Sequence, residues 1–229
     1  MDADNFSIKY IFEFDSNDSL EFAVNINRKT LISVAPTESK ESKWTLLDFN
    51  KCEHCPFTQD KVKNCPIAFN ISGVAENFAK RLSTEEINVR VITEEREYYK
   101  RETVQHGLRS ILGIYTATSG CPHMDILKPM ARFHLPFATV EETMYRYVTS
   151  YLLSQYFEYN KGNKPDFDLD GLLEKSDNVD KVSYGISTRI EEITVGDANN
   201  NAIVILNAIG LMLKIEIDNK LDSLRYLFK

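Results

Sequence analysis

The hydrophobic residues of this 229-residue chain change their period once, and that change constrains the fold more than any other feature. In the first fifty residues, apolar and polar side chains alternate in three runs, at 7–14, 19–26 and 29–36, and turn-forming residues separate the runs. Alternation with a period of two, in segments rich in β-branched and aromatic residues, predicts half-buried strands. The runs therefore predict a small antiparallel meander. Residues 42–49 are a candidate for a further strand, and 88–93 are expected to form another.

From Ile71 onward the period becomes helical. Val74, Phe78 and Leu82 fall at four-residue steps, and the segment 98–118 has the same spacing. Apolar residues recurring every three or four positions predict helices with one buried face. Similar stripes at 140–156, 182–193 and 202–229 predict that the second half of the chain is helical.

Several residues mark helix ends. Gly120 is expected to end the helix of 98–118, and Pro122 suits the first position of the next helix, where its missing N–H needs no partner. This places Cys121 at the N-cap of that helix. Thr139 and Glu142 have the spacing of a capping box, which predicts a helix beginning at residue 140.

A polar run at 159–168, containing Gly162 and Pro165, is the best linker candidate in the chain. We therefore predict an α+β fold in which a small N-terminal antiparallel β-sheet packs on helices. Residues 1–160 are expected to form this α+β domain, 161–168 a linker, and 169–229 an all-helical C-terminal extension.

Charge and composition exclude several classes of function. The apolar fraction of 43% is typical of a globular protein, and the formal charge of −7, with scattered basic residues, disfavours nucleic acid as a partner. The N-terminus has no secretory signal, which predicts a cytoplasmic protein. The most apolar stretch, 202–213, is short for a bilayer and contains Asn207, so no membrane span is expected.

Four cysteines form the only constellation with clear chemical meaning. Cys52 and Cys55 make a C-x2-C pair, Cys65 follows after nine residues, and Cys121 lies 56 positions further on. Each of the last three is followed by proline. A reducing compartment disfavours structural disulfides, so clustered thiols there indicate metal or redox chemistry. Four thiolates suit tetrahedral zinc, and they also suit an iron–sulfur cluster.

Other interpretations of these residues stay open. His54 lies inside the C-x2-C pair and His123 lies two positions after Cys121, so either is able to replace a cysteine as ligand. Cys121 at a helix N-terminus is also a candidate nucleophile with a lowered pKa, with His123 or His134 as base and Asp125 as orienting group. Four inert buried thiols are the plainest alternative.

The runs "YIFEFDSNDSLEF", "CEHCPFTQDKVKNCPIAFN" and "TSGCPHMDILKPMARFHLPFATVEETMYRYVTSYLLSQYF" resemble a family of uncharacterised bacterial proteins, over about residues 7–159. The resemblance implies that cysteines equivalent to Cys52, Cys55, Cys65 and Cys121 act together and that His54 is incidental. It implies no activity and no cofactor, and it ends before the helical C-terminal segment.

Taken together, these features predict a cytoplasmic metal-binding module with a structural zinc ion held by Cys52, Cys55, Cys65 and Cys121. An iron–sulfur or thiol-redox protein using the same cysteines is the first alternative, and a metal-free scaffold or oligomerisation protein is the second. We expect a protein partner, or self-association, through the C-terminal helices. No residue is predicted to be catalytic.

Overall fold

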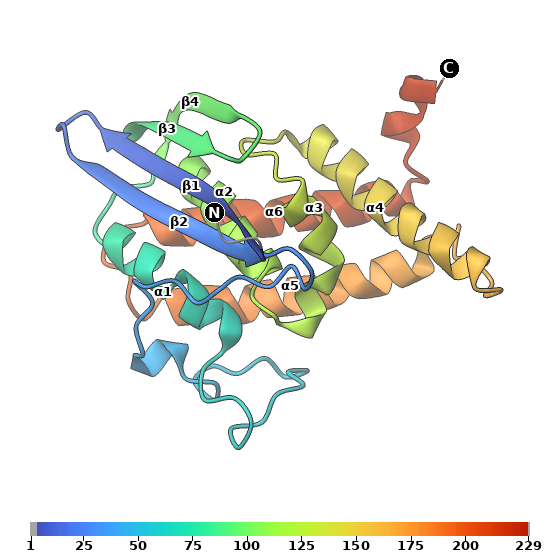
Figure 1. Ribbon diagram of the computed structural model, residues 1–229, viewed down its shortest axis with the longest axis horizontal. Helices are drawn as coiled ribbons and strands as arrows, with labels where there is room; N and C mark the ends of the chain where they lie inside the picture. Colours follow the sequence, from blue (N-terminus) through green and yellow to red (C-terminus); the bar gives the residue numbers. More distant parts are fainter. Residues whose placement is uncertain (1–3, 229) are drawn as a thin grey trace.

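The computed structural model describes residues 4–228 and has the predicted α+β architecture, a four-stranded antiparallel sheet covered by helices (Figure 1). The strands are β1 (Asn5–Phe14), β2 (Ser19–Asn27), β3 (Glu86–Ile92) and β4 (Glu97–Thr103), in the order β2-β1-β3-β4. Strand β1 is therefore central, and β3 reaches its other edge only after the long excursion of residues 28–85.

Alternation explains the β1–β2 hairpin. Along β1, Phe6, Ile8, Tyr10, Phe12 and Phe14 are all buried on the face that the helices cover. The turn between the strands contains Asn17 with φ of 62°, a left-handed conformation that asparagine tolerates well. The first two predicted strands are thus confirmed, as is the strand predicted at 88–93.

The expected third strand at 29–36 was wrong, because that segment makes only an isolated bridge between Ser33 and Ile26. The candidate strand at 42–49 is instead occupied in part by a short 3-10 helix, η1 (Lys43–Thr45). The actual fourth strand, β4, lies where the helical stripe of 98–118 was expected to begin. Because β4 is an exposed edge strand, ion pairs such as Arg90–Glu97 and Arg101–Glu86 replace the apolar alternation that predicts strands.

Helix α1 (Pro66–Phe78) and helix α2 (Val104–Ala117) contribute most of their buried side chains to the core under the sheet. Helix α2 approaches the strands closely at Gly107, where a Cβ atom would lie 3.0 Å from Val89 and 3.1 Å from Phe12. A side chain here would require the neighbouring side chains to shift, so glycine favours this close contact between helix and sheet.

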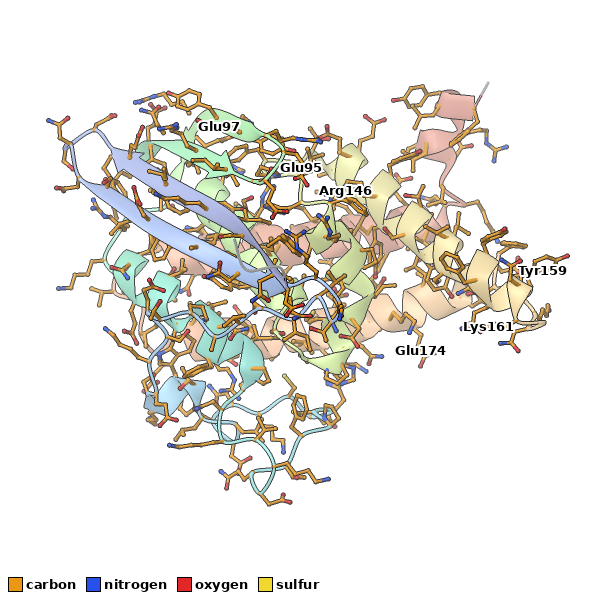
Figure 2. The ribbon with its side chains drawn as sticks, in the orientation of Figure 1. Glu95, Glu97, Arg146, Tyr159, Lys161 and Glu174 are labelled. Atoms are coloured by element: carbon orange, nitrogen blue, oxygen red, sulfur yellow. The ribbon has the colours of Figure 1, made fainter. Side chains whose placement is uncertain are left out.

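After α2 the chain forms the 3-10 helix η2 (Pro122–Leu127), the short helix α3 (Lys128–Arg132) and helix α4 (Val140–Asn160). The predicted capping box of α4 is confirmed, since Thr139 Oγ1 accepts from the Glu142 N–H at 3.2 Å and Glu142 Oε2 accepts from the Thr139 N–H at 2.8 Å. Figure 2 shows Tyr159 and Lys161 at the far end of α4, whereas Arg146 lies nearer the sheet.

The C-terminal helices are α5 (Asp170–Ile190) and α6 (Ala198–Asp218), followed by the 3-10 helix η3 (Asp222–Phe228). The predicted linker, 161–168, lies between α4 and α5 and has no regular structure. Beyond it, Val182 and Ile186 of α5 and Ala202 and Ile203 of α6 belong to the same hydrophobic cluster as the sheet. The helices after the linker therefore contribute to the central core.

Helix α6 is longer than the apolar stretch 202–213 suggested, because residues 198–201 belong to it as well. Among residues 4–228 it alone is long and apolar enough to cross a membrane by length and composition. Only 22% of its apolar window is buried, and α6 buries one face, with Ala202, Ile203, Ile209 and Leu213, against its neighbours.

Candidate metal centre

Cys52, Cys55 and Cys65 lie along the loop between η1 and α1. The Cys55 N–H donates to the Cys52 carbonyl at 3.0 Å, which closes a tight turn between the first two thiols. Cys65 is the N-cap of α1 with Pro66 at the first helical position, and its N–H donates to the Thr45 carbonyl at 2.8 Å. These backbone bonds hold the three thiols at defined points of an otherwise irregular loop.

Cys121 comes from the turn after α2 and is buried. As predicted, it is an N-cap followed by proline, and it precedes η2. Gly120, with φ of 85°, turns the chain out of α2 immediately before it. The backbone N–H of His123 donates to the Cys121 sulfur, and the Met124 N–H donates to the Cys121 carbonyl at 2.9 Å. Cys65 and Cys121 thus occupy equivalent positions at the starts of two helices.

Two histidines join the loop to the Cys121 turn. His123 Nε2 donates to the His54 carbonyl at 3.0 Å, and the two imidazole rings lie 4.3 Å apart. His54 Nε2 donates in turn to the Asn178 carbonyl of α5 at 3.3 Å, while its Nδ1 is buried without a hydrogen-bond partner. Burial, with the nearby charge of His123, lowers the pKa of His54, so its imidazole is neutral at neutral pH.

Helix α5 also touches the loop directly. A Cβ atom at Gly185 would lie 2.7 Å from the Cys52 sulfur, so the missing side chain at that position provides the space for the thiol. A glycine inside a helix is a weak signal of such close approach, and the sequence alone did not identify Cys52 as its neighbour.

The four thiols are close enough for their charges to interact. Burial, with smaller contributions from the charges of Cys65, Cys55 and Cys52, raises the pKa of Cys121 to about 12. Burial also raises the pKa of Cys52, with added contributions from Cys65 and Cys55. Like charges at short range disfavour thiolates, so in the absence of a cation these two cysteines are protonated at neutral pH.

The nucleophile interpretation of Cys121 gains no support from these facts. A lowered pKa was expected from the helix N-terminus, but burial outweighs that effect. Neither proposed base has the required partner, because His123 bonds to the loop and His134 contacts Tyr10 on β1. Asp125 pairs with Lys128 instead.

Arg189 of α5 anchors the segment that precedes the thiols, and sequence reasoning did not single it out. Its guanidinium is fully buried and donates to the carbonyls of Trp44 at 2.8 Å, Leu46 at 2.7 Å and Leu47 at 2.8 Å. It forms no ion pair with a carboxylate among residues 4–228. Its positive charge acts to lower the pKa of Cys52, but the burial of that thiol and the charges of the other cysteines outweigh this effect.

The donor set fits zinc chemically, since four thiols converge from three points of the chain beside a neutral imidazole. Within the described range, 4–228, no group of three or more His, Cys, Asp or Glu side chains is positioned to hold a metal ion. The thiols are therefore neighbours without forming a coordination shell in this structure.

These features define an α+β protein in which α5 packs against the loop that carries Cys52 and His54. The chain belongs to the family described as domain of unknown function DUF6901, whose model matches residues 8–229. The match includes the C-terminal helices, which the resemblance over 7–159 did not cover. Comparisons with curated proteins and with solved structures found no match.

Proposed function

We propose that this protein binds one zinc ion through Cys52, Cys55, Cys65 and Cys121, and that the ion has a structural role. The observation that carries the proposal is the convergence of four thiols from the loop, the start of α1 and the start of η2. Four thiolates at short range repel one another, and a divalent cation would offset that repulsion, so the proximity of the four thiols favours a metal site.

The surroundings support zinc in this role. A zinc ion with four thiolates carries a net charge of −2, and the buried, unpaired guanidinium of Arg189 beside Cys52 supplies a positive charge. Because the loop of residues 46–64 has little regular structure, coordination would tie it to the start of α1 and the start of η2. Metal binding would then contribute directly to folding free energy.

We further propose that the module acts through a protein partner or a second copy of itself. Leu211 and Ile215 on α6, and Tyr226 and Phe228 on η3, are large apolar side chains that are more than half exposed. An Ile215→Lys variant is expected to reduce the molecular mass measured by sedimentation if these side chains mediate self-association. If the wild type is an oligomer and the Ile215→Lys variant has the same mass, that part of the proposal is refuted.

The experiment that tests the metal is elemental analysis with a visible spectrum, on protein purified without oxygen. About one zinc per chain and a colourless solution are expected, with zinc lost in each of the four single Cys→Ser variants. His54→Ala is the matched control, because it alters the same turn without removing a thiol. Zinc should be retained in it.

Two results would overturn the proposal. Iron with acid-labile sulfide and a visible absorbance that bleaches in air would assign the cysteines to a redox cluster. Absence of any metal, with no change of the thermal midpoint on adding zinc or a chelator, would leave four buried thiols as packing groups.

A further inference from the structure

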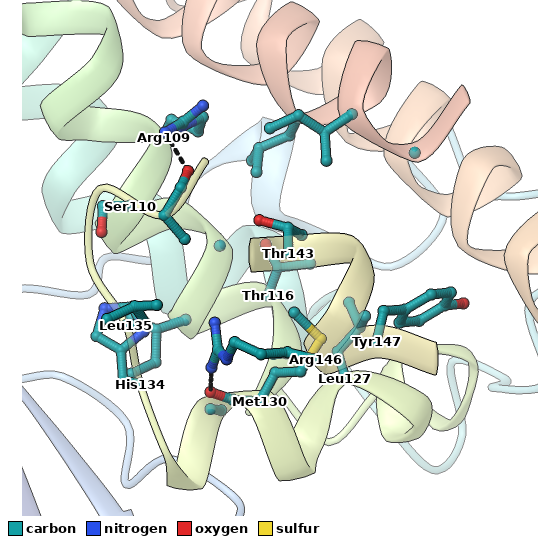
Figure 3. A pocket seen from close by; sticks show the side chains of 18 of the residues that line it. Arg109, Ser110, Thr116, Leu127, Met130, His134, Leu135, Thr143, Arg146 and Tyr147 are labelled. Carbon is teal, nitrogen blue, oxygen red and sulfur yellow. Dashed lines mark hydrogen bonds between the residues drawn. The ribbon is translucent and has the colours of Figure 1, made fainter. Parts of the chain in front are cut away.

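A cavity of about 200 Å³ lies where α2, α3, α4 and α6 meet, away from the cysteines (Figure 3). It occupies the seam between two hydrophobic clusters, because Ile114 of α2 belongs to the cluster under the sheet and Ile209 of α6 belongs to the cluster under α4. Leu127, Met130 and Leu213 complete much of the apolar wall.

Two arginines reach this cavity from different helices. Arg109 of α2 donates to the Ala138 carbonyl at 3.3 Å, and Arg146 of α4 donates to the carbonyls of Met130 at 2.6 Å and Phe133 at 2.7 Å (Figure 3). Both side chains are partly buried, and burial lowers the pKa of each guanidinium.

Neither arginine has a carboxylate partner within residues 4–228. Glu102, whose charge acts on Arg109, pairs instead with Lys100, and Glu142, whose charge acts on Arg146, is held in the capping box of α4. No Asp or Glu lines the cavity. Two arginines therefore line an apolar cavity that no acidic residue lines, and Arg146 also borders a neighbouring pocket that contains Glu94 and Glu95.

The remaining polar lining is neutral. Burial and the nearby charge of Arg146 lower the pKa of His134 to about 3, and the uncharged imidazole contacts the Tyr10 hydroxyl. That hydroxyl lies 2.9 Å from Ser110 Oγ. Because partly buried charges are costly without a counter-charge, this lining is complementary to an anion attached to an apolar body.

We infer that the cavity binds a small apolar monocarboxylate, such as a medium-chain fatty acid, with its carboxylate at Arg109 and Arg146. A guanidinium offers a planar pair of donors that matches a carboxylate. The volume is below the roughly 300–1,000 Å³ of sites for drug-sized ligands, and it exceeds the ~150 Å³ of an engineered cavity that holds benzene. A nucleotide is too large and too polar for this space.

The test is isothermal titration calorimetry of the full chain with octanoate, 1-octanol and octylamine, which share one apolar chain and differ in the head group. Saturable binding of octanoate is expected, at least tenfold tighter than that of the alcohol or the amine. Arg109→Gln and Arg146→Gln should each weaken octanoate binding about tenfold or more. Arg90→Gln removes the same charge from β3, where Arg90 pairs with Glu97 and does not line the cavity, and it is expected to leave binding unchanged.

A second variant separates loss of binding from loss of folding. Gly113 lines the cavity, and a Cβ atom there would meet only Leu206, at 3.7 Å. Gly113→Leu should therefore fill the cavity, keep a cooperative thermal transition and abolish octanoate binding. The inference is overturned if octanoate does not bind, if octanol binds equally well, or if a folded Gly113→Leu protein binds as the wild type does. No cysteine lines the cavity, so these outcomes are independent of the zinc proposal.

Discussion

Replacing Arg189 by methionine tests whether α5 holds the cysteine loop in place. The guanidinium makes three hydrogen bonds to the carbonyls of residues 44, 46 and 47, and each bond from a charged donor contributes about 1.5–3 kcal/mol. Methionine fills similar space but leaves the three acceptors without a donor. It also removes the cost of burying an unpaired charge, which offsets part of the loss.

The net effect we expect is a loss of about 3–5 kcal/mol in the free energy of unfolding. For a chain of this size, each kcal/mol shifts the thermal midpoint by about 2–4 °C, so the midpoint should fall by about 6–20 °C. Because these bonds lie at the base of the loop, limited proteolysis should cut residues 48–64 faster in the variant.

Fluorescence gives a local readout, since Trp44 is the only tryptophan and is buried beside the guanidinium. Its emission should shift to longer wavelength in Arg189→Met as water reaches the indole. Arg189→Lys keeps the charge but is unable to span three carbonyls, so an intermediate loss is expected. Arg225→Met, at an exposed site, should change stability by less than about 0.5 kcal/mol. A loss below about 1 kcal/mol in Arg189→Met, with unchanged emission, would refute the role assigned to this residue.

Two further predictions concern α2 and the pH dependence of stability. Gly107→Ala should lower the free energy of unfolding by about 1–3 kcal/mol, because its Cβ would lie 3.0 Å from the sheet. Gly113→Ala, in the same helix but with room for a Cβ atom, should raise the free energy of unfolding by about 0.5–1 kcal/mol. Equal urea midpoints for the two variants would contradict this account. His134 has its folded pKa lowered to about 3, so between pH 6.5 and 3 the unfolded chain binds its proton more readily than the folded chain. Stability should therefore fall as the pH drops through that window, by at most about 1.4 kcal/mol per pH unit. His134→Gln should flatten this dependence in urea titrations; parallel curves for the variant and the wild type would show that His134 is not responsible.

How far the sequence predicts this fold depends on where each segment lies. The β1–β2 hairpin and the α4 capping box depend on neighbouring residues, and both were predicted correctly. Strand β4 was missed because an edge strand is stabilised by ladder bonds and ion pairs with β3, which leave no apolar alternation. The segment 29–36 has strand-like composition, but it makes only an isolated bridge to Ile26 and does not join the sheet.

The candidate site divides in the same way. The sequence determines two local features through spacing and proline: the clustering of Cys52, Cys55 and Cys65, and the position of Cys121 at an N-cap. What gathers the four thiols is not local: contact between His123 and the His54 carbonyl crosses 69 positions. No periodicity encodes a contact of that range, because it depends on how complete elements pack.

By itself, the sequence determined that this chain forms an α+β protein and that three of its four cysteines lie close together along the chain, because period and spacing act over a few residues. Only the tertiary structure decided that α5 and α6 enter the central core and that Arg189 anchors the loop. It also decided that Arg109 and Arg146 meet at one cavity. Buried charges and close backbone contacts arise when separate elements share a core, and the sequence of one segment does not show which other segments it will pack against.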